Sequence, residues 1–353
     1  MAKTTETKRN SLTNEFEQTM KPVSLWSDAW RRLRKNKMAF AGLIVIAFYF
    51  AVCLASPILP IYSYDEQVVV HQNLPPSFHG AGKVMIATRT AYLKQVMEAD
   101  GRTSFNADEQ AQVRAMEQDV QTNPVHKRVY LLGTDNLGRD LLSRILYGGR
   151  ISIMIGLTGT ITAVFVGIVL GSISGYVGGR LDNLLMRFVD IMYSLPYMLL
   201  VIIMMALFGQ NIFNLFVAIA LVSWLTIARV VRGQVMSLKN AEFVEAARSM
   251  GASPGRIIFR HLTPNTLGVI VVFSTLMVPQ FIMQESFLSF LGLGVSAPMA
   301  SWGSLVSDGA NVMELYPWQL LAPAITMTVF LFAMNFLGDG LRDALDPQSK
   351  NKL

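Results

Sequence analysis

The sequence predicts an all-α polytopic membrane protein with six transmembrane helices. The 353 residues are 52% hydrophobic and 15% charged, whereas soluble proteins usually carry about 25% charged residues. Six apolar runs reach the length of about 20 mostly apolar residues that a membrane-spanning helix requires. Lys and Arg residues gather beside these runs, so too few charges remain to cover a water-facing surface.

The six apolar runs define the expected spans. Their approximate limits are 38–59, 151–177, 188–208, 212–230, 267–291 and 318–337. Hydrophobic periodicity adds little, because a helix in lipid is apolar on all sides. Pro196 and Pro279 lie inside two of the runs. We expect each to kink its helix, because proline lacks the N–H that the preceding turn needs.

The placement of basic residues predicts the orientation of the spans. Cytoplasmic segments carry more Lys and Arg than segments on the other side of the membrane. With a cytoplasmic N-terminus, the short outer connections 209–211 and 292–317 contain no Lys or Arg. The basic clusters then lie inside, at 31–37, 180–187, 232–260 and 342–352. Segment 61–150 is mixed, but loops longer than about 60 residues do not follow the rule. Both termini are therefore expected in the cytoplasm.

These limits divide the chain into five parts. They are a cytoplasmic segment (1–37), a first span (38–60), an extracytoplasmic segment (61–150), a five-helix core (151–338) and a cytoplasmic tail (339–353). The leader before the first span is long and partly acidic, unlike that of a cleaved signal peptide, so we expect a retained anchor. An amphipathic pattern within it favours an interfacial helix, with an ordinary basic flank as the alternative. The pattern comprises Leu25, Trp26, Trp30 and Leu33.

Composition and motifs argue against other classes of protein. The net charge of +6 could suit nucleic acid, but its position beside apolar runs indicates a membrane. Cys53 is the only cysteine, and the four histidines (71, 79, 126 and 261) are scattered. We therefore expect no disulfide and no metal site. No nucleophile, metalloprotease or P-loop motif is present, so no catalytic residue is assigned.

Two carboxylates, Asp190 and Glu285, lie within the expected spans. Charges inside a membrane are costly and are therefore candidates for function. For both residues we favour structural pairing over transport chemistry, and Arg187 or Arg229 could neutralise Asp190.

The stretch 240–265 is expected to form two short helices separated by a sharp break. Asn240 can cap the first helix, and Glu242 and Glu245 lie in its early turns, where the helix dipole favours negative charge. Gly251 supplies the left-handed residue that ends this helix. A second helix then starts with Ser253 as its cap and Pro254 at its first position.

Each of these helices has an apolar face. On the first helix it comprises Phe243, Ala246, Ala247 and Met250. On the second it comprises Ile257, Ile258, His261 and Leu262, and Pro264-Asn265 is expected to end the helix. A helix face of small residues can enter a groove on a partner protein. Packing on its own bundle explains the pattern equally well, so both interpretations stay open.

A resemblance to a known family favours the first interpretation. Glu245-Ala246-Ala247 followed by Gly251, Arg260-His261 and Pro264-Asn265 resembles the "EAA" coupling loop of binding-protein-dependent ABC importer permeases. Other segments resemble the dipeptide/oligopeptide/nickel branch, most closely its C-type oligopeptide permeases. They are 132–144 (with Gly133, Thr134, Asp135, Gly138, Arg139 and Asp140), 286–294, 301–303, 308–311 and 338–347. The resemblance extends from about residue 24 to residue 347.

This resemblance implies a type I (MetI-like) ABC importer permease in a bacterial inner membrane. Such permeases pair with a second, homologous permease and with two cytoplasmic ATPases, which bind ATP and Mg²⁺. An extracytoplasmic binding protein delivers the substrate, so the chain needs no cofactor of its own. The substrate expected from the closest branch is an oligopeptide, with dipeptides, nickel or other small solutes as alternatives. The stretch 240–265, with His261, would contact the ATPases.

The motif 133–144 is expected to lie outside the membrane. Asp135 with Arg139, and Asp140 with Arg144, are each four residues apart and could pair along a helix. Thr134 or Asp135 would cap that helix, and Gly148-Gly149 would loosen its entry into the span. Guiding of substrate and plain helix stabilisation both fit these residues.

Segment 81–129 is an insertion relative to the family pattern, because about fifty residues separate Pro75-Pro76-Ser77 from the Gly-Thr-Asp motif. Two polar helices are expected within it, at 90–99 and 108–121. A module that contacts the binding protein and a solvated insertion without function are both compatible with this segment.

Two other classes of function are less well supported. An ion-driven secondary transporter should show repeat-related halves with broken helices and midplane carboxylates, and no convincing internal repeat is present. A membrane-embedded enzyme should show a catalytic constellation, and none is apparent.

Overall fold

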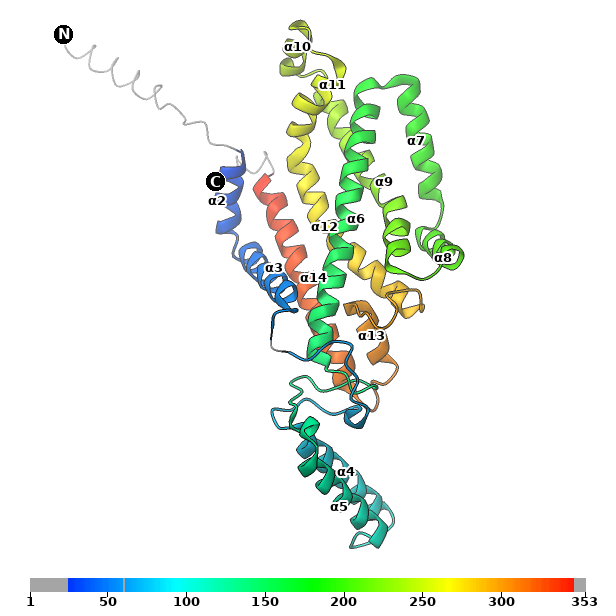
Figure 1. The fold of residues 1–353 in the computed structure, drawn as a ribbon. Coiled ribbons are helices and arrows are strands. Elements are labelled where there is room, and N and C mark those ends of the chain that lie inside the picture. The colour runs from blue at the N-terminus through cyan, green and yellow to red at the C-terminus, as the bar shows by residue number, and fades with distance from the viewer. Residues whose placement is uncertain (1–24, 60, 346–353) are drawn as a thin grey trace, which may run out of the picture.

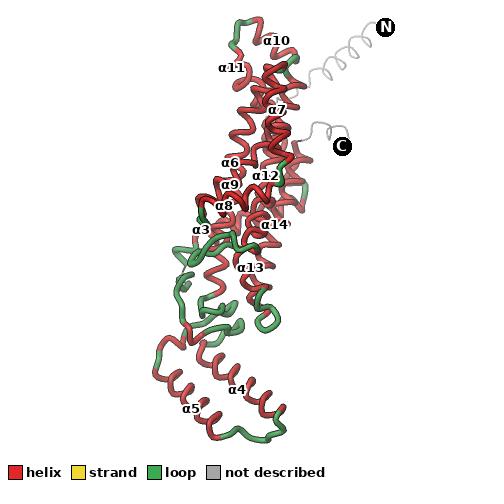
Figure 2. Tube along the Cα trace, turned by 90° about the vertical axis from the view of Figure 1, so that its right-hand side faces the viewer, coloured by secondary structure: helices red, strands yellow, loops and turns green. Residues whose placement is uncertain are grey.

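The computed structural model describes residues 25–59 and 61–345, and this part of the chain folds into helices and loops without a β-strand (Figures 1 and 2). Residues 1–24 and 346–353 lie outside the described part. The first 24 residues of the expected N-terminal segment, most of the expected tail, and Asp346-Pro347 of the C-terminal motif therefore stay untested.

Five continuous helical stretches are long and apolar enough to cross a membrane. They are α3 (Lys37–Ala55), α6 (Leu141–Val177), α9 (Ile212–Leu238), the stretch Pro254–Phe290, and α14 (Pro317–Leu345). A sixth span is formed only if α7 (Gly179–Ser194) and α8 (Tyr197–Phe208) are taken together. The expected all-helical membrane fold is confirmed, and its third span is a broken one.

The bend expected at Pro196 is a sharp break, because α7 and α8 meet there at an angle of 79°. The helical stretch also begins at Gly179, earlier than the expected start at residue 188. Leu195 between them has extended backbone angles (φ −78°, ψ 132°). Pro196 explains this conformation, because its ring disfavours a helical residue before it and it has no N–H to donate. Pro279 behaves differently, since α12 (Thr263–Phe290) continues past it as one helix.

The centre of the bundle is the contact between α6 and α9. Three glycines four residues apart on α6 form a stripe that faces α9. A Cβ on Gly167 would lie 2.6 Å from the Ile227 side chain, and one on Gly175 would lie 2.8 Å from the Arg232 carbonyl oxygen. A Cβ on Gly171, between them, would overlap the Ala228 carbonyl. Small residues at this spacing let two membrane helices approach closely.

The helix expected near the N-terminus is present as α2 (Leu25–Lys35), which contacts α3 and α14. Ala29 and Leu33 are buried on this side, whereas Trp30 is exposed. Asn36 then caps α3 by accepting a hydrogen bond from the Ala39 N–H (3.2 Å). Whether α2 lies in a membrane interface stays a prediction.

A helical hairpin projects from one end of the bundle, opposite the end that carries α10 (Glu242–Ser249) (Figure 1). We call these the hairpin end and the α10 end. The hairpin consists of α4 (Ala81–Ala99) and α5 (Ala107–Thr122). Both helices expected in segment 81–129 are thus present, and the first starts nine residues earlier than expected.

A chain of buried hydrogen bonds attaches the hairpin to the loops beneath it. His71 lies in the short helix η1 (Val69–His71) and His126 in η2 (Pro124–Lys127). The His71 Nε2 atom lies 2.8 Å from His126 Nδ1, and His71 Nδ1 lies 3.0 Å from the Tyr130 hydroxyl. His126 Nε2 in turn lies 2.9 Å from the Asp119 carboxylate. His71 and His126 therefore lie in contact, although the sequence had indicated only four scattered histidines.

Candidate functional site

The stretch 240–265 forms the tip of the α10 end. Gly251 has φ +79°, its N–H donates to the Arg248 carbonyl (3.0 Å), and the Ala252 N–H donates to the Ala247 carbonyl (3.0 Å). These two bonds form the left-handed helix ending that glycine favours, as the sequence indicates. The expected cap at Asn240 is wrong, because the cap position is Ala241 and no side chain bonds there.

The two sides of α10 differ from the expected apolar stripe. Ala247 is only 2% exposed and, with Val244, packs into the core of the bundle. Met250 is 81% exposed and Phe243 is also exposed. The exposed residues on the outward side of α10 and at its cap position are Glu242, Phe243, Glu245, Ala246, Arg248, Ser249 and Met250. Ala247 does not belong to this outward face, because the same helix must also bury a side against the bundle.

The second helix does not end at Pro264-Asn265. After α11 (Pro254–Arg256), which begins with proline as expected, the chain makes a π-helical turn (η3, Ile257–Leu262) and runs directly into α12. Pro264 cannot donate to the preceding turn, and a widened turn accommodates a proline inside a helical run. Ile257, Ile258 and Leu262 are buried, as expected, and His261 is half-buried. Ser253 occupies the cap position without a side-chain bond.

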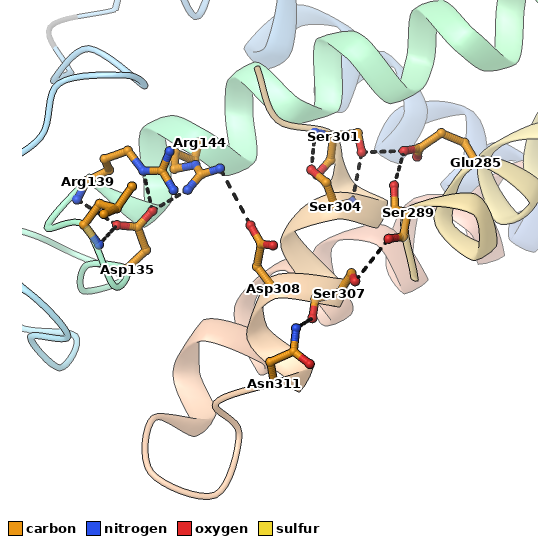
Figure 3. Close-up of polar contacts among 11 residues, drawn as sticks. Asp135, Arg139, Arg144, Glu285, Ser289, Ser301, Ser304, Ser307, Asp308 and Asn311 are labelled. Atoms are coloured by element: carbon orange, nitrogen blue, oxygen red, sulfur yellow. Dashed lines mark hydrogen bonds and ion pairs between the residues drawn. The ribbon is translucent and has the colours of Figure 1, made fainter. Parts of the chain in front are cut away.

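At the hairpin end, Asp135 organises the motif 133–144 (Figure 3). One carboxylate oxygen accepts from the N–H groups of Leu137 and Arg139 (both 2.9 Å). The other accepts from Arg139 Nε (2.6 Å) and from the Arg144 guanidinium. Asp135 lies in a tight turn before α6, so the expected i,i+4 pair with Arg139 forms without a helix.

Two other expectations for this motif were wrong. Asp140, rather than Thr134 or Asp135, caps α6, because its carboxylate accepts from the Ser143 N–H (2.9 Å). Arg144 consequently pairs with Asp135, and it also lies 4.0 Å from Asp308. Thr134 instead bridges two loops, accepting from the Leu74 N–H (2.8 Å) and donating to the His71 carbonyl (2.5 Å).

Gly133 and Gly138 allow this turn to exist. Both have positive φ angles (+81° and +72°), and a Cβ on Gly138 would overlap the Val68 carbonyl oxygen. The segment 133–140 is therefore packed tightly against the loop that leads to His71. Sequence alone does not reveal this contact, because the partner loop lies about sixty residues away.

A short helix, α13 (Trp302–Ala310), lies at the hairpin end of the bundle next to this motif (Figure 1). Trp302 is fully buried, and its indole N–H donates to the Ile145 carbonyl (3.0 Å). A Cβ on Gly149 would lie 2.7 Å from the Trp302 ring. Gly148-Gly149 therefore provides room for α13, and it does not loosen α6, which continues unbroken.

Glu285 is the buried carboxylate of this region, with 0% exposure. Its Oε1 atom accepts from the hydroxyls of Ser289 (2.8 Å) and Ser301 (2.6 Å), and no cation pairs with it among the described residues (Figure 3). The expectation of ionic pairing was wrong for Glu285. Hydroxyl groups from α12 and from the cap of α13 bond to its Oε1 atom, whereas Oε2 is buried and has no hydrogen-bond partner among the described residues. Through Oε1 this carboxylate ties the two helices together.

Asp190 behaves as expected, because Arg229 pairs with it (2.5 Å). A second, unexpected ion pair lies nearer the α10 end, where Arg232 donates to both oxygens of Asp182 (2.5 and 2.6 Å). Both pairs connect α7 with α9. Each pair joins the two helices by an ionic contact, so neither Asp182 nor Asp190 is left as an unpaired carboxylate that could bind a coupling ion.

Comparison with known proteins identifies the family. Residues 167–351 match the family described as "binding-protein-dependent transport system inner membrane component". The chain belongs to this family. Residues 24–76 of the permease also match the N-terminal transmembrane domain of oligopeptide transport permease C. The resemblance seen in the sequence is thereby confirmed, and the permease is a membrane transport component, not an enzyme.

Individual relatives match the permease along most of its length. The oligopeptide transport system permease protein OppC of Haemophilus influenzae is 42% identical over 334 residues, covering 95% of this chain and 92% of that protein. OppC of Escherichia coli K12 is 42% identical, covering 93% and 92%. The dipeptide transport system permease protein DppC of Bacillus subtilis is 39% identical, covering 92% and 87%.

Among solved structures, an inward-facing methionine ABC transporter, MetNI, aligns with the permease. The TM-score is 0.49 and the sequence identity is 18%, over 58% of this chain and 98% of that chain.

Proposed function

We propose that this permease is one of two homologous membrane subunits of an ATP-driven oligopeptide importer. The observation that carries the proposal is its 42% identity, over 95% of the chain, to a permease named for oligopeptide transport. Within the importer the chain forms half of the membrane pathway, and it contributes no catalytic residue and no cofactor site.

The proposed orientation places the α10 end in the cytoplasm of the bacterial inner membrane. The α10 end carries Arg232, Arg248, Arg256 and Arg260 in or beside its helices, and cytoplasmic segments are rich in basic residues. The hairpin end then faces the extracytoplasmic binding protein. This orientation puts both termini inside, as the sequence predicts.

The outward face of α10 is the proposed contact with the ATPase subunits. Its exposed apolar residues, Phe243 and Met250, lie beside the acidic Glu242 and Glu245, a composition that suits insertion into a groove of a partner. ATP and Mg²⁺ would be held by the two ATPases. Reversing a 1:99 population of inward and outward states requires about 5.5 kcal/mol of differential binding, which nucleotide-driven closure would deliver through α10 and η3.

At the hairpin end, the motif 133–140 and α13 form the proposed entrance from the binding protein. Arg144, which pairs with Asp135, lies 4.0 Å from Asp308 on α13, and α13 rests on α12 and α14. A role of α4 and α5 in docking the binding protein stays a prediction.

Dipeptide import is the second candidate function. The observation that favours it is the 39% identity to DppC of Bacillus subtilis over 92% of the chain, which is close to the identity with the oligopeptide permeases. Uptake of labelled dipeptides and pentapeptides by the reconstituted importer would separate the two candidates.

The coupling role of Gly251 can be tested in the same importer. No heavy atom lies within 4 Å of a Cβ built on Gly251, so the main cost of Gly251→Val is backbone strain of at least about 1–2 kcal/mol, because Val is β-branched. We expect the complex to assemble and hydrolyse ATP while peptide uptake falls at least about tenfold. Gly209→Val is the matched control, since Gly209 also has positive φ (+88°) and free space but lies in the α8–α9 connection. Normal uptake by Gly251→Val would contradict the coupling role.

Cross-linking distinguishes the two sides of α10. In a Cys53→Ala background, we expect a cysteine at Met250 to cross-link to an ATPase subunit and a cysteine at Ala247 to remain unreactive. Equal reaction at both positions would contradict the proposed face.

A further inference from the structure

A polar cavity lies at the break between α7 and α8, within the membrane-spanning part of the bundle. Its volume is about 230 Å³, and α7, α8, α9 and α12 line it. Six polar side chains contribute to the lining, and no charged residue does. They are Tyr193, Tyr197, Ser223, Thr226, Gln280 and Gln284.

Some of the hydrogen-bonding capacity in this cavity is already used. The Tyr197 hydroxyl donates to the side-chain oxygen of Gln284 (2.8 Å), and the hydroxyls of Tyr193 and Thr226 lie 2.5 Å apart. These bonds connect α8 to α12 and α7 to α9. They hold the broken span in place and fix the orientation of the Gln284 amide.

Other hydrogen-bonding groups in the cavity have no partner. The side-chain amide of Gln280 and the amide nitrogen of Gln284 make no hydrogen bond with any residue that the structure describes. The two glutamines are four residues apart on α12 and therefore lie on the same face of the helix. Polar groups at membrane depth face the interior of a bundle or a water-filled path, because lipid cannot satisfy them.

We propose that Gln280 and Gln284 form a transit site for the backbone amide groups of a passing peptide. This inference rests on the proposed function as a peptide importer. A carboxamide offers one acceptor and two donors, which complement the N–H and C=O groups that every peptide unit carries. An uncharged lining binds peptide units without selecting the charge of their side chains.

The size of the cavity supports transit and not storage. Sites that enclose a whole drug-sized ligand measure roughly 300–1,000 Å³, so a cavity of about 230 Å³ holds only a short part of an oligopeptide at one time. Successive peptide units can then exchange their hydrogen bonds with the two glutamines as the chain moves through the broken span.

The test uses the complete reconstituted importer and two labelled substrates, tetra-alanine and its backbone N-methylated analogue, which lacks amide donors. For the wild type and for Gln280→Leu/Gln284→Leu, uptake of both peptides is measured below saturation. Loss of one hydrogen bond lowers binding by about fivefold. We expect the double variant to take up tetra-alanine about fivefold to tenfold more slowly. We also expect the preference for tetra-alanine over its analogue to shrink by a similar factor.

The preference for tetra-alanine over its analogue is compared between the wild type and the double variant as a ratio. The same binding protein delivers both peptides to both permeases, so its own preference cancels in this ratio. Met283→Leu is the matched control, since Met283 is exposed on α12 outside the cavity, and it should leave the ratio unchanged. An unchanged preference in the double variant would overturn the proposal. Loss of the second permease from the purified double variant would also overturn it, because the glutamines would then be subunit contacts. Absence of peptide uptake by the wild type would instead refute the proposed function.

Discussion

Acidification should loosen the attachment of the helical hairpin through protonation of His71. Burial lowers the pKa of His71 from 6.5 to about 4, with smaller contributions from His126 and Arg128, while Asp119 acts in the opposite direction. Tyr130 can donate to His71, His71 to His126, and His126 to Asp119, an arrangement that gives every ring nitrogen a partner. A second proton on His71 would place a positive charge inside this buried series of hydrogen bonds.

The sign and size of the effect follow from the two pKa values. The opened state binds a proton at His71 below about pH 6.5, and the closed state does so only below about pH 4. Stability is therefore complete above pH 7 and falls as the pH is lowered through this window. At pH 5 the loss is about 2 kcal/mol, which raises the open population about 30-fold.

Thiol labelling of the purified chain measures this opening. Two single-cysteine variants are made in a Cys53→Ala background. A cysteine at Ala81, which is buried at the start of α4, becomes reactive only when the hairpin opens. A cysteine at Ala87, on the exposed side of α4, reacts without opening, so its labelling rate corrects for the effect of pH on thiol ionisation. We expect the ratio of labelling rates to rise about 20-fold from pH 7 to pH 5. His71→Gln should abolish this rise and His79→Gln, at an exposed position, should not. A constant ratio in the unsubstituted chain would refute the reasoning.

Three further predictions concern substitutions at closely packed or buried positions. Gly138→Ala should lower thermal stability by about 3 kcal/mol or more, whereas Gly101→Ala, which has a similar φ (+67°) but free space, should cost about 1 kcal/mol. Gly171→Leu should prevent α6 from packing on α9 and abolish stable expression, while Gly233→Leu, at an open helical position, should express normally. Glu285→Ala should cost about 2–4 kcal/mol in thermal unfolding, because two buried hydroxyls lose their acceptor, and an unchanged melting temperature would contradict that role.

Features set by neighbouring residues were predictable from the sequence. The apolar runs locate the spans because lipid imposes a length and a composition on each helix. Gly251 ends α10 as expected, since a left-handed residue at a helix end depends only on the local chain. Pro196 was correctly singled out, but the angle of the break depends on how α8 packs against α9 and α12.

Features that join distant segments were not predictable in the same way. His71 and His126 are 55 residues apart, and Glu285 finds Ser301 across a loop, so no local pattern links them. Ala247 was assigned to the outward face of α10 because a stripe of small residues does not indicate which side is buried. The glycine stripe at 167, 171 and 175 is an exception, because its spacing of four residues is visible in the sequence and could have indicated a helix contact.

The length of α6 has a consequence for communication across the membrane. Its 37 residues extend about 55 Å, well beyond a hydrocarbon core of about 30 Å. One rigid rod therefore contacts both α13 at the hairpin end and the π-helical turn η3 below α10. Any energetic coupling carried by this rod is reciprocal. If nucleotide on the ATPases changes the affinity for the binding protein by some factor, the binding protein must change the affinity for nucleotide by the same factor.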